Sequence, residues 1–239
     1  MPGPHSSIST LHREQLPAIT TLRRICQSIA MLDAILSPEW SARYYSFNSR
    51  WAPGQAMASM RNGSGNDYHV LFTPAGAILK GYAHESRMAR YCVEHGHPWP
   101  GVLEGVPDEF AGFLAEPAFS SNETTFCLWR RWTDTGWHIG SFDILDAPED
   151  GSEDLLVMLD GNPATYKAWA EEYYDDPGDD EGEDEDAEPL SDGLPLEAIA
   201  QVYAHAPLTE EVVHALNPMV ERADLAEDSE EIGYPSPLP

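Results

Sequence analysis

Hydrophobic residues recur every three or four positions over residues 16–36, a spacing typical of a helix with one buried face. Arg23, Arg24 and Asp33 fall on the opposite, polar face. Pro38 follows, and because proline disfavours the α conformation of the residue before it, the helix should end there. We expect this amphipathic helix to pack against the sheet that the next residues predict.

The pattern then changes to short extended stretches separated by turn residues. Asn, Gly and Ser at 62–66 and Pro-Ala-Gly at 74–76 predict tight turns, because glycine supplies positive φ and asparagine tolerates it. Residues 124–143 predict one more hairpin, turning at Asp134, Thr135 and Gly136. The first four strands are expected over residues 43–48, 55–61, 67–73 and 77–83.

Helical spacing returns in several shorter segments, over residues 85–93, 107–114, 152–159, 164–174, 195–204 and 209–221. Thr209 is a candidate N-cap for the last of them, and Pro218 should kink or end it. The predicted fold class is therefore α+β: an antiparallel meander sheet of about six strands, packed with helices on one side.

Composition divides the chain into four parts. Residues 1–14 are rich in Pro, Gly and Ser and are expected to be disordered. Residues 15–174 should form the α+β globular domain, followed by an acidic disordered linker over 175–192. Residues 193–239 should form a helical C-terminal tail, and the sequence leaves open whether this tail docks on the domain.

The formal net charge of −28 is concentrated at one end of the sequence. Residues 1–145 hold 13 Asp and Glu against 11 Lys and Arg, whereas residues 146–239 hold 28 against 2. Such a field attracts cationic partners and repels phosphate backbones, so we expect a basic protein partner and no direct nucleic-acid binding. An acidic surface also serves solubility alone, which is the simplest alternative.

The acidic run at 175–188 holds ten Asp and Glu in fourteen residues. It does not fit an EF-hand loop, because placing Gly182 at the required sixth position puts Pro177 at the first, where a side-chain oxygen is needed. No cofactor and no specific metal site is therefore expected there. The predicted partner-binding residues are Asp179, Asp180, Glu183, Asp184, Glu185 and Asp186.

Cysteine usage and hydropathy bear on the compartment. Three cysteines, an odd number, argue against a disulfide framework and favour a reducing environment. No apolar signal segment and no run long enough to cross a membrane is visible, so a cytoplasmic protein is expected. Cys92, His95 and His97 include zinc-binding residue types, but their spacing matches no standard site, and a buried cysteine beside loop histidines is the favoured interpretation.

Catalytic signatures are absent from the sequence. Ser64 between two glycines lacks the flanking pattern of a nucleophile elbow, and no phosphate-binding glycine motif occurs. An enzyme with a pocket on the N-terminal sheet stays an alternative, and its candidate residues are Arg43, Tyr44, Arg61, His69 and His84. A structural component of a larger assembly is the third alternative.

Three segments, RYYSFNSRW at 43–51, MRNGSG at 60–65 and GYAHES at 81–86, resemble bacterial proteins of unassigned function. The chain is also similar in general character to immunity proteins of bacterial toxin systems, which are small, acidic, cytoplasmic and α+β. The resemblance implies a non-enzymatic acidic binding protein, such as an immunity or inhibitor protein that neutralises a basic toxin. It assigns no role to any single residue.

Overall fold

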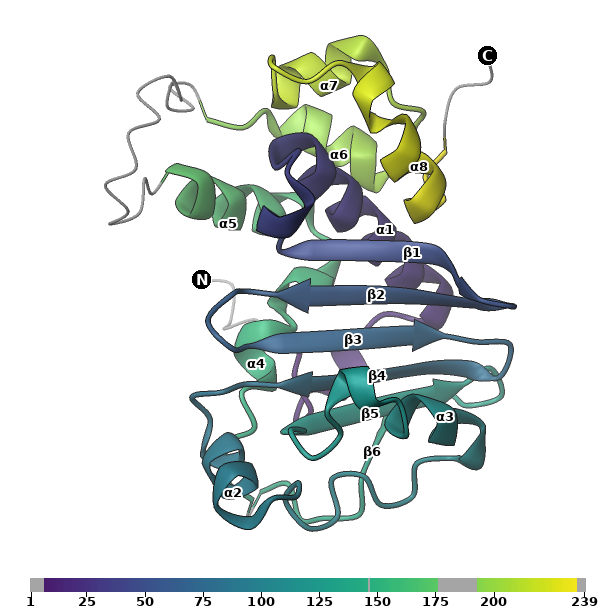
Figure 1. Cartoon of the computed structure of the whole chain (residues 1–239), viewed down its shortest axis with the longest axis vertical. Helices are drawn as coiled ribbons and strands as arrows, with labels where there is room; N and C mark the ends of the chain where they lie inside the picture. The colour runs from purple at the N-terminus through teal and green to yellow at the C-terminus, as the bar shows by residue number, and fades with distance from the viewer. Residues whose placement is uncertain (1–6, 146, 176–192, 236–239) are drawn as a thin grey trace.

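A computed structural model describes residues 7–145, 147–175 and 193–235. Its centre is a six-stranded antiparallel sheet in which each strand pairs with its neighbours in sequence, from β1 to β6 (Figure 1). The α+β class and the meander predicted from the sequence are thereby confirmed. The strands are β1 (Tyr45–Ala52), β2 (Gln55–Arg61), β3 (Asp67–Phe72), β4 (Gly76–Tyr82), β5 (Phe126–Arg131) and β6 (His138–Ile139).

Strand register sorts the side chains into two faces. One row across the sheet joins Ser46, Ser59, His69, Lys80 and Cys127, which stand opposite one another on successive strands. The next row along the strands is apolar and projects from the other face, because successive side chains of a strand alternate. That second row consists of Phe47, Ala58, Val70, Leu79 and Leu128.

The apolar face lies against α1 (Ile19–Leu36), which passes behind the sheet in Figure 1. Leu22, Leu32 and Ile35 are completely buried, as the three- and four-residue spacing predicts. Other helices gather around α1 at one end of the molecule, and they contribute to the same hydrophobic core. They are α5 (Pro163–Asp175), α6 (Leu196–Tyr203), α7 (Glu210–Leu216) and α8 (Ala226–Ile232).

The expected C-terminal tail is therefore part of the main core over its described residues, 193–235. Ile199, Val202 and Val213 have no exposed surface, and α6 packs on both α1 and α5. Tyr234 donates hydrogen bonds from its hydroxyl to the carbonyl oxygens of Val202 and Ala206, each at 3.0 Å. The boundary at residue 193 consequently does not separate two cores.

The opposite face of the sheet carries a cover of its own, although the sequence led us to expect helices on one side. A second hydrophobic cluster joins Met57, Leu71, Ile78 and Trp129 of the strands to Phe110 and other residues of the 84–123 segment. Figure 1 shows α3 in front of the sheet. The covering elements are α2 (Arg87–His95), η3 (Asp108–Phe110), α3 (Ala111–Leu114) and η4 (Pro117–Phe119).

Several helix ends have the physical causes expected of them. Thr209 caps α7 by accepting a hydrogen bond from the backbone N–H of Val212, and α7 ends at Leu216 because extended Asn217 precedes Pro218. The single helix expected over 152–159 is instead two short pieces. The remaining elements are η1 (Arg13–Gln15), η2 (Trp40–Ala42), α4 (Ser152–Leu155), η5 (Val157–Asp160) and η6 (Arg222–Leu225).

Residues 7–14, which composition assigned to a disordered segment, lie against the domain. Ile8 is 4% exposed, and the backbone N–H of Thr10 donates to the Ser152 hydroxyl at 3.0 Å. The Thr10 hydroxyl also bonds to the carboxylate of Asp150. One apolar anchor and a few long-range hydrogen bonds order this stretch, which an average over Pro, Gly and Ser content does not register.

Candidate functional site

The six predicted partner-binding residues, Asp179, Asp180, Glu183, Asp184, Glu185 and Asp186, lie outside the described residues. The structure instead shows where the acidic run begins and where it ends. Helix α5 ends at Asp175, and the described chain resumes at Gly193 just before α6. The geometry of these two anchors fixes the end of the molecule to which the run belongs.

A clamp of two side chains holds the two anchors together. The Glu171 carboxylate of α5 accepts the backbone N–H of Leu194 at 2.8 Å, and Lys167 Nζ donates to the Leu194 carbonyl oxygen at 2.6 Å. Lys167 and Glu171 also form an ion pair with each other. The hydrogen bond that Lys167 donates within this pair holds the pKa of the Glu171 carboxyl below its ordinary value. Buried Leu194 is thus fixed on α5, so the acidic run leaves and rejoins the fold at one place.

Gly193 belongs to this clamp for a steric reason. Its φ is +70°, a conformation that residues with a side chain rarely adopt. A Cβ atom at this position would lie 2.5 Å from Glu171 Oε1 and 3.4 Å from Lys167 Nζ. A glycine therefore lets the chain pass close enough to α5 for the clamp to form.

Two further helices at the same end of the molecule, α7 and α8, carry an unbalanced negative charge. Residues 210–232 hold eight carboxylates against Arg222 alone, and all of the eight except Asp228 are exposed. These residues lie on α7, η6 and α8, or directly before η6 in the case of Glu221, at the top of Figure 1. They are Glu210, Glu211, Glu221, Asp224, Glu227, Asp228, Glu230 and Glu231.

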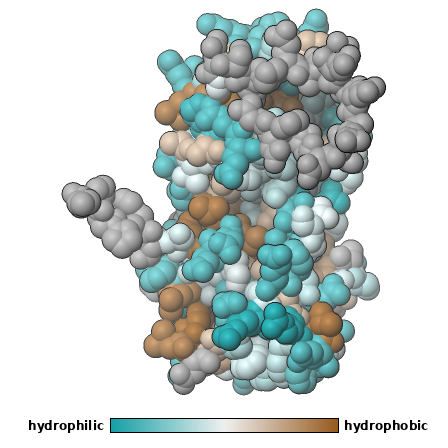
Figure 2. Space-filling model, turned by 90° about the vertical axis from the view of Figure 1, so that its left-hand side faces the viewer, coloured by the Kyte–Doolittle hydropathy of each residue, from teal (hydrophilic) through white to brown (hydrophobic). Residues whose placement is uncertain are grey.

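Figure 2 shows the side of the molecule that faces left in Figure 1. Among the residues coloured there, hydrophilic side chains are interspersed with small, separate hydrophobic patches. A large continuous apolar patch would have marked an interface driven by hydrophobic burial. The visible surface instead suits recognition by polar and charged groups.

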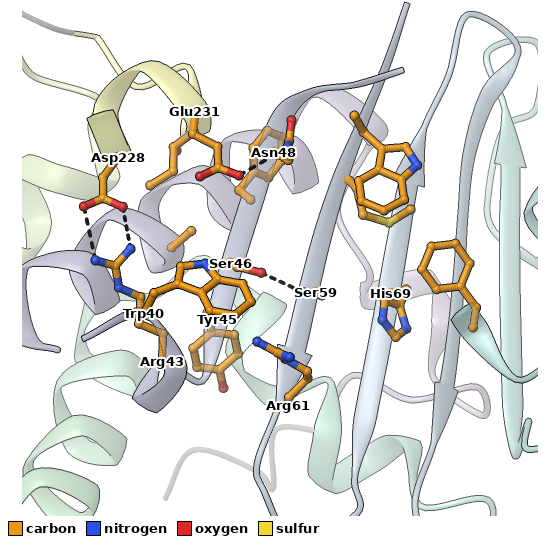
Figure 3. A pocket seen from close by; sticks show the side chains of 16 residues that line it. Trp40, Arg43, Tyr45, Ser46, Asn48, Ser59, Arg61, His69, Asp228 and Glu231 are labelled. Atoms are coloured by element: carbon orange, nitrogen blue, oxygen red, sulfur yellow. Dashed lines mark hydrogen bonds and ion pairs between the residues drawn. The ribbon is translucent and has the colours of Figure 1, made fainter. Parts of the chain in front are cut away.

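A second feature is a pocket of about 210 Å³ at the β1 edge of the sheet (Figure 3). Its floor comes from β1, β2 and β3, through Ser46, Ser59 and His69. Trp40 of η2 and Glu231 of α8 belong to its walls. The cover formed by residues 84–123 contributes only Phe119 to it. The pocket thus lies where the cover of this face gives way to α8.

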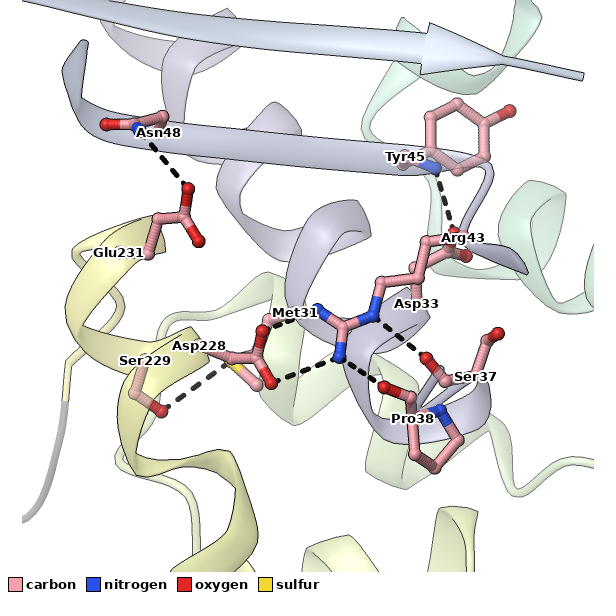
Figure 4. Close-up of polar contacts among 10 residues, drawn as sticks. All are labelled: Met31, Asp33, Ser37, Pro38, Arg43, Tyr45, Asn48, Asp228, Ser229 and Glu231. Carbon is pink, nitrogen blue, oxygen red and sulfur yellow. Dashed lines mark hydrogen bonds and ion pairs between the residues drawn. The ribbon is translucent and has the colours of Figure 1, made fainter. Parts of the chain in front are cut away.

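Arg43, at the wall of the pocket, is saturated with partners (Figure 4). Its guanidinium forms a two-pronged ion pair with Asp228, including an Nη2–Oδ2 distance of 3.1 Å. It also donates to the carbonyl oxygens of Ser37 and Pro38, each at 2.9 Å. Arg43 therefore ties α8 to the C-terminal end of α1, and its charge is neutralised by Asp228.

Arg61 differs from Arg43, because its guanidinium is exposed and forms no ion pair with any residue that the structure describes. It lies 4.9 Å from the centre of the Trp40 ring, a cation–π arrangement. Asp67 stands opposite Arg61 in the strand register without bonding to it. Beside this pair, the hydroxyls of Ser46 and Ser59 are hydrogen-bonded to each other at 2.7 Å.

His69 lies in the same row as Ser59 and stays neutral. Burial, together with the positive charges of Lys80 and Arg61, lowers the pKa of its imidazole to about 4. Its Nδ1 atom is buried, lies 3.7 Å from Asp67 Oδ1, and has no hydrogen-bond partner within the described ranges. The His69 ring packs against Phe119, with 4.6 Å between ring centres.

Lys80 is the other titratable group of this row. Only 1% of it is exposed, and its ammonium group donates to the carbonyl oxygens of Phe119 and Ser120. Burial lowers the pKa of Lys80. This lysine fastens the 117–120 segment to the sheet and so keeps Phe119 at the pocket.

The five residues named for an enzyme do not share one pocket. Arg43, Arg61 and His69 line it together. Tyr44 packs instead on Trp169, with ring centres 5.1 Å apart, and the ring of His84 bonds to Asn66 at 2.9 Å.

The sequence missed the pocket residues that strand alternation does not reach. Trp40 belongs to a short 3₁₀ turn, and Asp228 and Glu231 come from a helix about 180 positions away in the chain. Trp40 could have been noticed in the sequence, because it lies outside every predicted helix and strand, where a large aromatic residue is not explained by core packing.

The three candidate metal ligands, Cys92, His95 and His97, each make a different contact. Cys92 is buried and its thiol donates to the Thr124 carbonyl oxygen, while the His95 ring stacks on Tyr91 with centres 3.9 Å apart. His97 bonds through Nδ1 to the Pro98 carbonyl oxygen at 2.8 Å. Over residues 7–145, 147–175 and 193–235, no group of three or more His, Cys, Asp or Glu side chains is placed to hold a metal ion. Within those ranges, no helix has the length and apolar character required to cross a bilayer.

Comparison of the chain with models of protein families, with curated proteins and with solved structures finds no match. The resemblance to bacterial proteins of unassigned function, and the similarity in character to immunity proteins, therefore stay predictions. The geometry shows two separate features: a clamp on α5 that holds the chain just after the acidic run, and a pocket at the sheet edge.

Proposed function

We propose that the protein is a non-enzymatic binding protein whose acidic end engages a basic protein partner, as an immunity or inhibitor protein engages a toxin. The carrying observation is that exposed carboxylates gather at one end of the molecule. Helices α7 and α8 and the turn between them expose carboxylates at the same helical end as α5 and α6, the two helices that flank the acidic run (Figure 1).

This arrangement favours a particular kind of encounter. A concentrated negative field speeds diffusion of a cationic protein toward the acidic end, and salt weakens that attraction. Lys167 and Glu171 of α5 hold Leu194, just after the run, so the residues that flank the run on both sides belong to the helical end of the fold. The acidic run then resembles a phosphate chain in charge density, and it suits a basic groove on the partner.

The test captures partners from an extract of the native host at low salt. One bait is the whole protein, and a second has Asp179, Asp180, Glu183, Asp184, Glu185 and Asp186 changed to the corresponding amides. A third bait is a matched control with six exposed carboxylates changed on the opposite half of the molecule. The control positions are Glu85, Glu94, Glu104, Asp108, Glu109 and Glu123.

We expect the unchanged protein and the control to recover the same basic protein, identified by mass, and the amide variant to lose it. The three baits should unfold at similar temperatures, because the substituted positions are outside the described core or exposed. Equal recovery by all three baits, or a partner that is not basic, would contradict the proposal.

A further inference from the structure

We infer that the pocket at the β1 edge binds a small carboxylate ligand, a single negative charge carried on a flat apolar body. The basis is the juxtaposition of an arginine outside any ion pair, Arg61, with exposed aromatic rings and a pair of serine hydroxyls in one hollow (Figure 3). This inference is independent of the proposed partner at the acidic end, because it rests on different side chains.

Arg61 provides the charge that the ligand must complement. Two other cations near the pocket already have partners. The Arg43 guanidinium donates to Asp228 and to two carbonyl oxygens, and the Lys80 ammonium donates to the Phe119 and Ser120 carbonyl oxygens. His69 is neutral because its pKa is lowered to about 4. Among the described residues that line the pocket, Arg61 is the one cation outside any ion pair, and its planar guanidinium matches a carboxylate through two parallel hydrogen bonds.

The surrounding rings define the body of the ligand. Trp40 is 54% exposed and Trp51 is 46% exposed, unusually open for residues of this size. Phe119 lies 6.0 Å from Trp51, between ring centres, so these two rings form a continuous apolar wall. A flat apolar group would cover this wall, and in doing so it would remove apolar surface from water.

The serine pair adds a donor beside Arg61. Ser46 and Ser59 share one hydrogen bond of 2.7 Å, which uses the proton of only one hydroxyl. The other hydroxyl keeps a proton to donate, since each hydroxyl has one donor and two acceptor sites. Ser59 and Arg61 project from the same face of β2, two positions apart, so one carboxylate can contact both.

Size and charge narrow the ligand further. A volume of about 210 Å³ is smaller than the roughly 300–1,000 Å³ typical of drug-sized ligands, so a compact molecule is required. Glu231 and Asp228 also line the pocket, and the whole chain has a net charge of −28. Both features oppose a second negative charge on the ligand, and they favour a carboxylate over a phosphate.

Two sources share this chemistry: a free aromatic acid, and the carboxyl terminus of a peptide with an aromatic last residue. Binding is followed by tryptophan fluorescence and by calorimetry on the full chain. The probes are benzoate, phenylacetate, the tripeptide Gly-Gly-Phe, the same tripeptide with an amidated terminus, and inorganic phosphate. Binding of the aromatic acids without the tripeptide identifies the first source, and tighter binding of the free tripeptide than of the acids identifies the second.

The decisive variant is Arg61→Gln, matched by Arg87→Gln, which changes another exposed arginine far from the pocket. We expect Arg61→Gln to weaken carboxylate binding about tenfold or more, because it removes a charge-assisted pair of hydrogen bonds. Arg87→Gln should leave binding unchanged, and both variants should have the same melting temperature as the unchanged protein. The inference is overturned if no carboxylate binds at millimolar concentration, if Arg61→Gln binds as well as the unchanged protein, or if phosphate binds as tightly as the carboxylates.

Discussion

The Glu171 carboxylate on α5 accepts the backbone N–H of Leu194, 23 positions along the chain, at a distance of 2.8 Å. This contact fixes the residue that follows the acidic run to the helix that precedes it. Because Leu194 is 2% exposed and belongs to the main core, the chain on both sides of the run is part of the fold.

Removing the clamp should free Leu194 from α5 without unfolding the domain. In Glu171→Ala, the amide of Leu194 loses its acceptor, so its hydrogen exchange should become faster while the amides of α1 keep their protection. The neighbouring Glu172→Ala is the matched control, since Glu172 is exposed and adjacent on the same helix. Unchanged exchange at Leu194 in Glu171→Ala would show that this contact does not hold Leu194 on α5.

Arg43 and Asp228 should contribute strongly to stability. Their side chains are only 9% and 20% exposed, and Arg43 makes further bonds to the end of α1. In a double-mutant cycle monitored by urea unfolding, we expect a coupling of about 2–3 kcal/mol for this pair. The exposed pair Arg50–Glu230, at 73% and 68%, should couple by less than about 1 kcal/mol. Equal couplings for the two pairs would refute the assigned role of Arg43.

Asp33 should make stability depend on pH in a defined direction. It accepts hydrogen bonds from the backbone of Tyr44 and Tyr45 and from the hydroxyls of Tyr166 and Tyr174. Burial nevertheless raises the pKa of the Asp33 carboxyl from 3.8 to about 6. Because the pKa of Asp33 is higher in the folded than in the unfolded chain, its contribution to stability is complete below about pH 4. That contribution is lost as the pH rises through about 6.

The comparison with Asp33→Asn isolates this group from the other carboxylates. The free energy of unfolding of the unchanged protein, minus that of Asp33→Asn, should fall by on the order of 3 kcal/mol between pH 4 and pH 7. Urea unfolding at several pH values measures it. A difference that stays constant with pH would mean that Asp33 has the same pKa in the folded and unfolded chains.

His69 should act in the opposite direction over a similar range of pH. Its folded pKa of about 4 lies below the ordinary 6.5, so its contribution to stability is complete above pH 6.5 and is lost as the pH falls toward 4. The variant His69→Gln should therefore be less sensitive to acid than the unchanged protein. If both lose stability equally between pH 6.5 and pH 4, then His69 titrates normally in the fold.

The sheet could be predicted from the sequence because its signals are local. Strand alternation and the turn glycines gave the order and direction of β1 to β4. The apolar spacing likewise gave α1, but the assignment of Asp33 to its polar face was wrong, because Asp33 is buried and accepts hydrogen bonds from Tyr166 and Tyr174. Such patterns depend only on a few neighbouring residues, which is why one sequence suffices.

The contacts that build the sites are distant in sequence, and no local pattern encodes them. The Arg43–Asp228 pair joins positions 185 apart, and the clamp joins α5 to the start of α6 across the acidic run. Ile8 and Thr10 show the same limit at the N-terminus, where packing overrides a composition typical of disorder. The helical segments of the cover were predicted at 85–93 and 107–114, but their position on the second face of the sheet was not, because it depends on contacts with distant strands.

The salt dependence of partner binding tests the central claim most directly. With the basic protein captured from the host and purified, calorimetry measures its affinity for the unchanged chain and for the six-amide variant at about 50 mM and about 500 mM salt. We predict tight binding of the unchanged chain at low salt, a steep loss at high salt, and weak, nearly salt-independent binding of the variant. Equal affinities of the two chains at both salt concentrations would contradict the account.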